Sequence, residues 1–215
     1  MPSRLKNRST HFLEENRTIF VTKGKIFMTL SMFEIMARAY QDKEQESPTM
    51  PATVQTMTQT YADICQGEDP WTALGNFTNA WYDYAKSIRP DLVSAPLIHP
   101  EQETAYTHRW AAFCAASVEF LCERYGVPCP EWVHDSRYSL SQPWSGSNIF
   151  PEITPQNLQT TPLPFVRRNI FCGSGLFKNK YELFDWMLEA RRKGITNPRE
   201  IHNYAHQKEM SIHGA

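Results

Sequence analysis

The sequence predicts a mostly α-helical protein: a single helical bundle domain with a long Pro/Trp-rich wrapped segment and a C-terminal helical extension. Apolar residues recur at three-and-four spacing in several stretches, which is the period of an amphipathic helix. Glycine or proline follows most of these stretches, where a helix would end. The 215 residues, 41% apolar and 13% aromatic, allow one compact domain with a sizeable core and exclude a disordered chain.

Three parts are expected along the chain. Residues 1–28 form a basic leader, which is either a short hairpin around Gly24 or an unstructured arm. Residues 29–175 form the helical domain, and residues 176–215 form a basic C-terminal helical extension.

The first half of the helical domain contains three predicted helices. A helix over 29–41 precedes a polar linker over 41–48. A second helix runs over 51–65, with Pro51 in its first turn. A third begins at Asp69 as cap, and its apolar stripe is Trp71, Leu74, Phe77, Trp81 and Tyr84.

The clearest helix is the long one over 101–125. Its stripe keeps helical spacing over five turns through Tyr106, Trp110, Cys114, Val118, Leu121 and Tyr125. Gly126 ends it, because glycine readily takes the left-handed conformation that closes a helix. Glu119 and Glu123 lie one turn apart on this helix, and we interpret them as part of a solvated face.

The wrapped segment, over 130–175, is predicted to be largely irregular, since it contains six prolines and many turn-forming residues. A loop of this length is ordered only when its side chains anchor it. We expect its large aromatic residues to dock on the helical body, where each contributes about 1.5–3 kcal/mol. Residues 168–172 are expected to add a short strand.

The C-terminal extension is predicted to hold two helices, over 179–193 and 197–210. Asn197 followed by Pro198 and Glu200 has the pattern of a helix start. From Phe165 to the end there are nine Lys and Arg against five Asp and Glu, although the whole chain has a net charge of −1. The charge pattern therefore argues against a protein that binds nucleic acid over its whole surface, and it leaves the C-terminal basic helices as a possible nucleic-acid contact.

Catalytic and metal-binding patterns are incomplete. His202 and His206 share a helix face, but a zinc-protease pattern would need a glutamate after the first histidine. Ser174 in Cys172-Gly-Ser-Gly lacks the glycine spacing of a nucleophile turn. The five cysteines are widely spaced and odd in number, which favours free thiols in a reducing, cytoplasmic compartment.

Four segments over residues 71–172 resemble a small, poorly characterised bacterial family. They are Trp71-Thr-Ala-Leu-Gly, Tyr125-Gly-Val-Pro-Cys-Pro-Glu-Trp-Val, Tyr138-x-Leu-x-x-Pro-Trp and Pro164-Phe-x-x-Arg-Asn-Ile-Phe. Members look like accessory proteins found beside toxin–antitoxin or regulator genes. The resemblance implies an interaction role, supplies no catalytic residues, and does not cover the helices from Lys178 onward.

The leading interpretation is a non-catalytic protein-binding accessory, antitoxin-like or regulatory, with no cofactor, no metal, no catalytic residue and no membrane segment. Its partner is a protein, with a toxin as one candidate. Aromatic and arginine side chains dominate interface energies. The expected contact residues are Trp132, Trp144, Phe165, Arg167, Arg168, Trp186, Arg191 and Arg192. The alternatives are a nucleic-acid-binding regulator using the C-terminal helices, and an enzyme or metalloprotein with a site near Cys172, His202 and His206.

Overall fold

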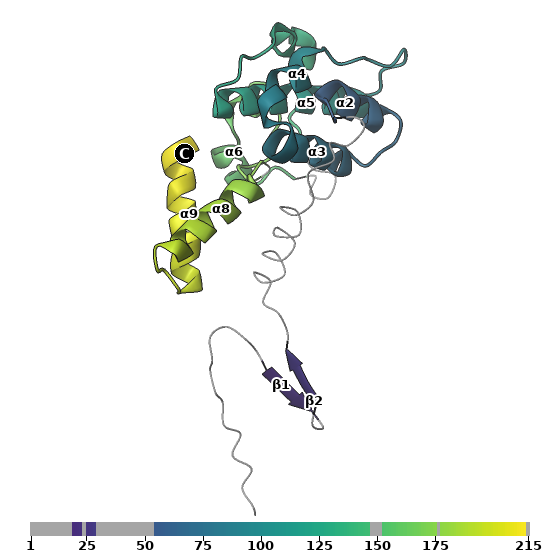
Figure 1. Cartoon of the computed structure of the whole chain (residues 1–215). Coiled ribbons are helices and arrows are strands. Elements are labelled where there is room, and N and C mark those ends of the chain that lie inside the picture. Colours follow the sequence, from purple (N-terminus) through teal and green to yellow (C-terminus); the bar gives the residue numbers. More distant parts are fainter. Residues whose placement is uncertain (1–18, 23–24, 29–53, 147–151, 176, 214–215) are drawn as a thin grey trace, which may run out of the picture. The chain divides into compact units, whose positions relative to one another are not determined.

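The computed structural model describes residues 19–22, 25–28, 54–146, 152–175 and 177–213. The contacts divide the chain into two compact units, 1–50 and 51–215. In the first unit, β1 (Ile19–Thr22) and β2 (Lys25–Met28) pair in antiparallel register (Figure 1). The hairpin alternative for this stretch is therefore the one observed. The helix expected over 29–41 and the linker over 41–48 lie outside the described residues.

The second unit is helical, as predicted (Figure 1). Its elements, in chain order, are α2 (Met57–Cys65), α3 (Pro70–Asn79), the π-helical turn η1 (Ala80–Tyr84), the 3-10 turn η2 (Lys86–Ile88), α4 (Arg89–Ser94), α5 (Ala105–Tyr125), the 3-10 turns η3 (Glu131–His134) and η4 (Ser136–Tyr138), α6 (Pro155–Thr160), α7 (Leu163–Val166), α8 (Lys180–Arg192) and α9 (Pro198–His213). None of the helices in the described ranges combines the length and apolar character needed to cross a bilayer.

Capping side chains set where the first helices start. The Asp69 side chain accepts from the backbone N–H groups of Trp71 and Thr72, which confirms the predicted start of α3. α2 starts later than predicted, because Thr56 caps it by accepting from the Gln59 N–H.

The chain after α3 departs from the prediction. The helical turns widen at η1, tighten at η2 and then give α4, a short helix that the sequence analysis did not predict. Pro90 lies in the first turn of α4, where the missing proline N–H costs no hydrogen bond.

α5 is the central element of this unit. It contacts α2, η3, η4 and α7, and the side chains from Trp110 to Glu119 are all buried. Thr104 and Thr107 form a reciprocal cap that starts the helix four residues later than predicted, and Gly126 ends it at φ 62°, as predicted. The core therefore surrounds α5 on nearly every side.

The wrapped segment docks on α5 through its rings, as expected. Phe165 is fully buried, with its ring centroid 5.2 Å from that of Phe113. Trp144 N–H donates to the Asn169 carbonyl at 2.9 Å, and Phe171 N–H donates to the Trp144 carbonyl at 2.8 Å. These bonds make a single parallel bridge between Trp144 and Ile170, and the strand expected over 168–172 does not form.

The α8–α9 hairpin packs against the end of α5 through polar contacts. The Tyr125 hydroxyl accepts from the Asn179 amide at 3.1 Å and donates to Glu182 at 3.4 Å. Arg124 pairs with Glu209 at 3.3 Å. The C-terminal helices therefore belong to the same compact unit as the bundle.

Candidate functional site

Aromatic side chains gather at the N-terminal end of α5, around the buried ring of Trp110. Trp71 and Trp144 meet this ring edge-on, with centroid distances of 5.6 and 5.2 Å. Tyr106 also contacts it and remains 38% exposed. Arg109 is exposed, and its guanidinium carbon lies 5.6 Å from the centre of the Trp144 ring.

We call the partly exposed residues Trp71, Tyr106, Arg109 and Trp144 the aromatic–arginine face. Its components come from three parts of the chain: the start of α3, the first turns of α5 and the wrapped segment. Arg109 Nε also donates to the Ala105 carbonyl at 3.1 Å, which fixes the side chain along the helix. Trp, Tyr and Arg are the residue types that carry most energy at protein interfaces, so this composition suits a protein contact.

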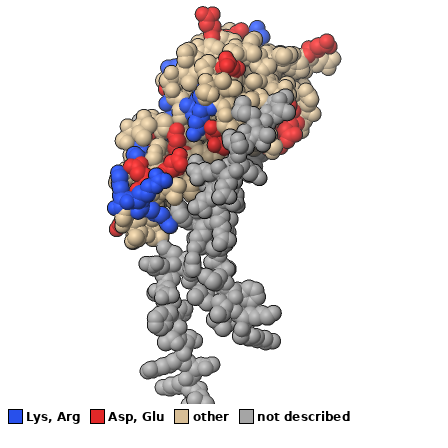
Figure 2. Space-filling view, in the orientation of Figure 1, with Lys and Arg blue, Asp and Glu red and all other residues tan. Residues whose placement is uncertain are grey.

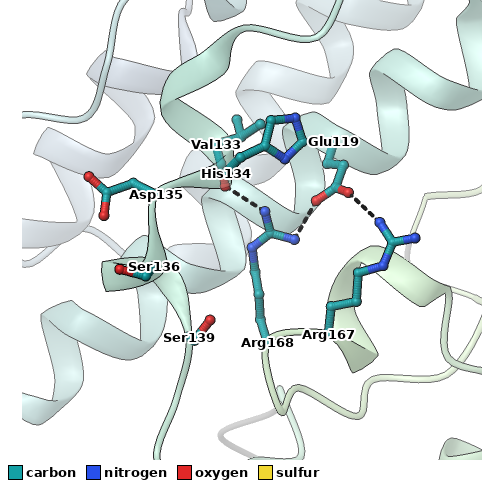
Figure 3. A pocket seen from close by; sticks show the side chains of 8 residues that line it. All are labelled: Glu119, Val133, His134, Asp135, Ser136, Ser139, Arg167 and Arg168. Carbon is teal, nitrogen blue, oxygen red and sulfur yellow. Dashed lines mark hydrogen bonds and ion pairs between the residues drawn. The ribbon is translucent and has the colours of Figure 1, made fainter.

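A second polar site lies further along α5, at Glu119. Its two carboxylate oxygens are taken by two consecutive arginines: Arg167 donates to one at 2.9 Å, and Arg168 donates to the other (Figure 3). Glu119 and Arg168 are nearly fully buried, whereas 54% of the Arg167 side chain is exposed.

Arg168 joins three segments of the fold. Besides Glu119 on α5, it donates to the Val133 carbonyl of η3 at 2.6 Å and to the Pro164 carbonyl of α7 at 2.7 Å. Asn169, which follows it, lies in the left-handed region at φ 60°, and its side-chain amide donates to the Leu140 carbonyl at 2.7 Å. A buried guanidinium with this many acceptors is held firmly in place.

A pocket of about 180 Å³ opens beside this ion pair. We call it the Glu119 pocket, and its lining residues are Glu119, Val133, His134, Asp135, Ser136, Ser139, Arg167 and Arg168 (Figure 3). The Asp135 carboxylate points away from Glu119 and accepts from Arg137. The backbone N–H of Arg137 is the main cause that lowers the pKa of Asp135.

The structure places the predicted contact residues in two groups. Phe165 and Arg168 are buried, so neither side chain can meet a partner in this conformation, and the expected surface has to be corrected for both. Burial of Phe165 in the core and pairing of Arg168 with Glu119 are the physical reasons. Arg167 is exposed beside the pocket, and Trp144 joins the aromatic–arginine face.

The remaining predicted residues lie elsewhere. Trp132 is half-buried, and its indole N–H donates to the Val93 carbonyl at 2.9 Å. Trp186 is half-buried in the α8–α9 hairpin, near His213. Arg191 and Arg192 are exposed at the end of α8, and none of these residues lines the Glu119 pocket.

The basic character of the hairpin is partly neutralised within it. Figure 2 shows Lys and Arg gathered at this end of the unit with acidic side chains beside them. Lys193 and Lys208 both pair with Glu189, and the Tyr204 hydroxyl donates to it at 2.7 Å. These hydrogen bonds, with Lys208 the largest cause, lower the pKa of Glu189 to about 2.

The residues of the enzyme or metalloprotein alternative do not form a common site. His206 pairs with Glu209 at 3.4 Å, and His202 is exposed. Burial raises the pKa of the Cys172 thiol to about 12, which keeps it protonated. Within the described ranges, no group of three or more His, Cys, Asp or Glu side chains is arranged to hold a metal ion.

The polar contacts of two residues, Glu119 and His99, were not predicted from the sequence. Glu119 is buried and paired, so its interpretation as part of a solvated face was wrong, although Glu123 is exposed. The available signal was that Glu119 is the only charged residue between Trp110 and Cys122. The second residue is His99, whose ring contacts Glu103 at 3.0 Å and the Tyr138 hydroxyl at 3.3 Å.

Comparison of the chain with models of known families, with curated proteins and with solved structures gave no match.

Proposed function

We propose that the protein is a non-catalytic binding protein that recognises a partner protein through the aromatic–arginine face. The observation that carries the proposal is the clustering of two tryptophans, a tyrosine and an arginine around Trp110, all partly exposed. Such a cluster offers a large contact area at a low cost in side-chain entropy, because aromatic rings rotate about few bonds.

The rigidity of this face supports the same proposal. Trp71 and Trp144 are held by a buried ring, and Arg109 is held by the Ala105 carbonyl and the Trp144 ring. A surface that is already ordered loses little conformational freedom when a partner binds. We therefore place the contact here and not on the buried pair of Phe165 and Arg168.

The class of partner follows from the resemblance given by the sequence. We propose an antitoxin-like or regulatory role, in which the partner is a toxin or a regulator.

The test is affinity purification of the full chain from a lysate of the source cells, with quantitative mass spectrometry. Arg109→Glu and Tyr106→Ala should each reduce recovery of the partner at least about tenfold, because hot-spot side chains contribute about 2 kcal/mol or more. Arg199→Gln is the control, since it alters an exposed arginine that lies outside both the aromatic–arginine face and the ion pair at Glu119. Equal recovery with all variants, or no protein recovered with the unchanged chain, would overturn the proposal.

A second candidate is nucleic-acid binding by the α8–α9 hairpin. It is favoured by the exposure of Arg192 and Arg199. Phosphate contacts would make the affinity fall steeply as salt rises. Fluorescence anisotropy with labelled DNA and RNA across a salt series tests this, and absence of binding at low salt would exclude it.

A further inference from the structure

We infer that the Glu119 pocket binds an oxyanion group, either a carboxylate or a phosphate. This site is separate from the aromatic–arginine face, and the inference does not rest on the partner proposed above.

The charge balance of the pocket favours an anion. One carboxylate, Glu119, is shared by the guanidinium groups of Arg167 and Arg168. Two positive charges thus face one negative charge, and each oxygen of that carboxylate already accepts a hydrogen bond from one of the arginines. Uncompensated charge that is partly removed from water is unfavourable, so an added anion is stabilising here.

Asp135 does not supply the missing negative charge. Its two oxygens accept from the Arg137 backbone N–H at 2.9 Å and from Arg137 Nε at 3.1 Å. Figure 3 shows its carboxylate directed away from the Glu119–Arg168 pair. Arg137 therefore balances Asp135, and the excess positive charge of the two other arginines remains.

The pocket also offers hydrogen-bond donors that an oxyanion can accept from. One Nη atom of Arg167 donates to Glu119. Among the described residues, the Nε and the other Nη of Arg167 have no hydrogen-bond partner. Ser139 also lines the pocket, and its hydroxyl group has no protein partner in the described ranges (Figure 3). A guanidinium edge and a nearby hydroxyl group are donors that suit a carboxylate or phosphate.

The size of the pocket suits a small anionic group. The pocket has a volume of about 180 Å³ and is open to solvent on one side. A phosphate group or the carboxylate end of a side chain fits this space. Arg168 lines the pocket and is held in position by the carbonyls of Val133 and Pro164.

The experiment titrates the full chain with sodium phosphate and, separately, with sodium acetate, at ionic strength held constant with sodium chloride. Binding is followed by NMR through the Nε–H signal of Arg167 and the amide signals of residues 134–139. We expect saturable shifts with at least one anion, with a dissociation constant of about 1–10 mM, as a few charge-assisted hydrogen bonds on an open site would give.

The variants locate the anion. Arg167→Gln should weaken binding at least about tenfold, while Arg167→Lys, which keeps the charge and loses the planar fork, should weaken it by a smaller factor. Arg109→Gln is the control, because it removes an exposed arginine from α5 outside the pocket. Stronger binding of acetate would identify a carboxylate ligand, and stronger binding of phosphate would identify a phosphoryl ligand.

The inference is overturned if neither anion gives a saturable shift, if chloride is as effective as both, or if Arg167→Gln binds like the unchanged chain. Should Arg167→Gln fail to fold, Arg167→Lys and Ser139→Ala give the same comparison. These outcomes do not depend on recovery of any partner protein, so the two proposals can fail separately.

Discussion

Glu119 and Arg168 form an ion pair in which both side chains are almost fully buried, at 4% and 7% exposed. The pair joins the middle of α5 to the residue two positions after α7. Arg168 also donates to the Val133 carbonyl, so one guanidinium fixes two parts of the wrapped segment on the central helix. A buried charge that loses its partner is strongly destabilising, so this carboxylate contributes to the attachment of the segment together with the packing of its aromatic rings.

Glu119→Gln should lower the free energy of unfolding by about 3 kcal/mol, because it leaves the buried Arg168 without an anionic partner. Urea denaturation measures the change. Glu123→Gln, one turn further along α5 and exposed, is the matched control and should change stability by no more than about 0.5 kcal/mol. A loss below about 1 kcal/mol for Glu119→Gln would show that the pair is not structurally important.

Trp132→Phe should lower the free energy of unfolding by about 1 kcal/mol, since the ring is kept but the Val93 carbonyl loses the indole donor. The same denaturation assay applies. Trp186→Phe is the comparison, because Trp186 is also half-buried and its indole nitrogen has no hydrogen bond within the described ranges. An equal effect of both substitutions would mean that ring size, and not the hydrogen bond to Val93, accounts for the loss.

The elements that local sequence determines were predictable. Apolar spacing and the glycine at 126 located α5 and its end, and Asp69 located the start of α3. The aromatic residues of the wrapped segment were expected to dock on the helices, and the burial of Phe165 agrees. Each of these features depends on residues within a few positions of one another, or on hydrophobicity alone.

The Glu119–Arg168 pair and the aromatic–arginine face were not predicted from the sequence, and the reason is the same for both. Glu119 and Arg168 are 49 positions apart, and no local spacing indicates that they meet. The aromatic–arginine face likewise joins Trp71, Arg109 and Trp144 from three segments. Arginine and aromatic content suggested a binding surface, but only the tertiary fold determines which of these side chains remain exposed.

Acid should loosen the α8–α9 hairpin by protonating Glu189. Folding lowers the pKa of this carboxyl group from 4.5 to about 2. A group with a lowered pKa stabilises the folded state above its unfolded value and loses that contribution as the pH falls through the folded value. The contribution is therefore complete above about pH 4.5 and lost toward pH 2.

The measurement for Glu189 is the side-chain carboxyl carbon shift across a pH titration. In Lys208→Ala the midpoint should rise toward the ordinary range, because the largest cause of the lowered pKa is removed. Lys178→Ala, at an exposed lysine before α8, is the control and should leave the midpoint unchanged. An unchanged midpoint in Lys208→Ala would contradict the pairing of Lys208 with Glu189.

Cys172 should be almost unreactive in the folded protein. Burial raises its pKa from 9.0 to about 12, so only about 10⁻⁴ of the thiol is ionised at pH 8, and the thiolate is the reacting species. Iodoacetamide labelling at pH 8, with the modified cysteines identified by mass spectrometry, should therefore be slow at Cys172 and fast after denaturation in urea. Rapid labelling of Cys172 in the native protein, faster than that of a free thiol such as glutathione, would contradict the burial effect and revive a nucleophilic role for this residue.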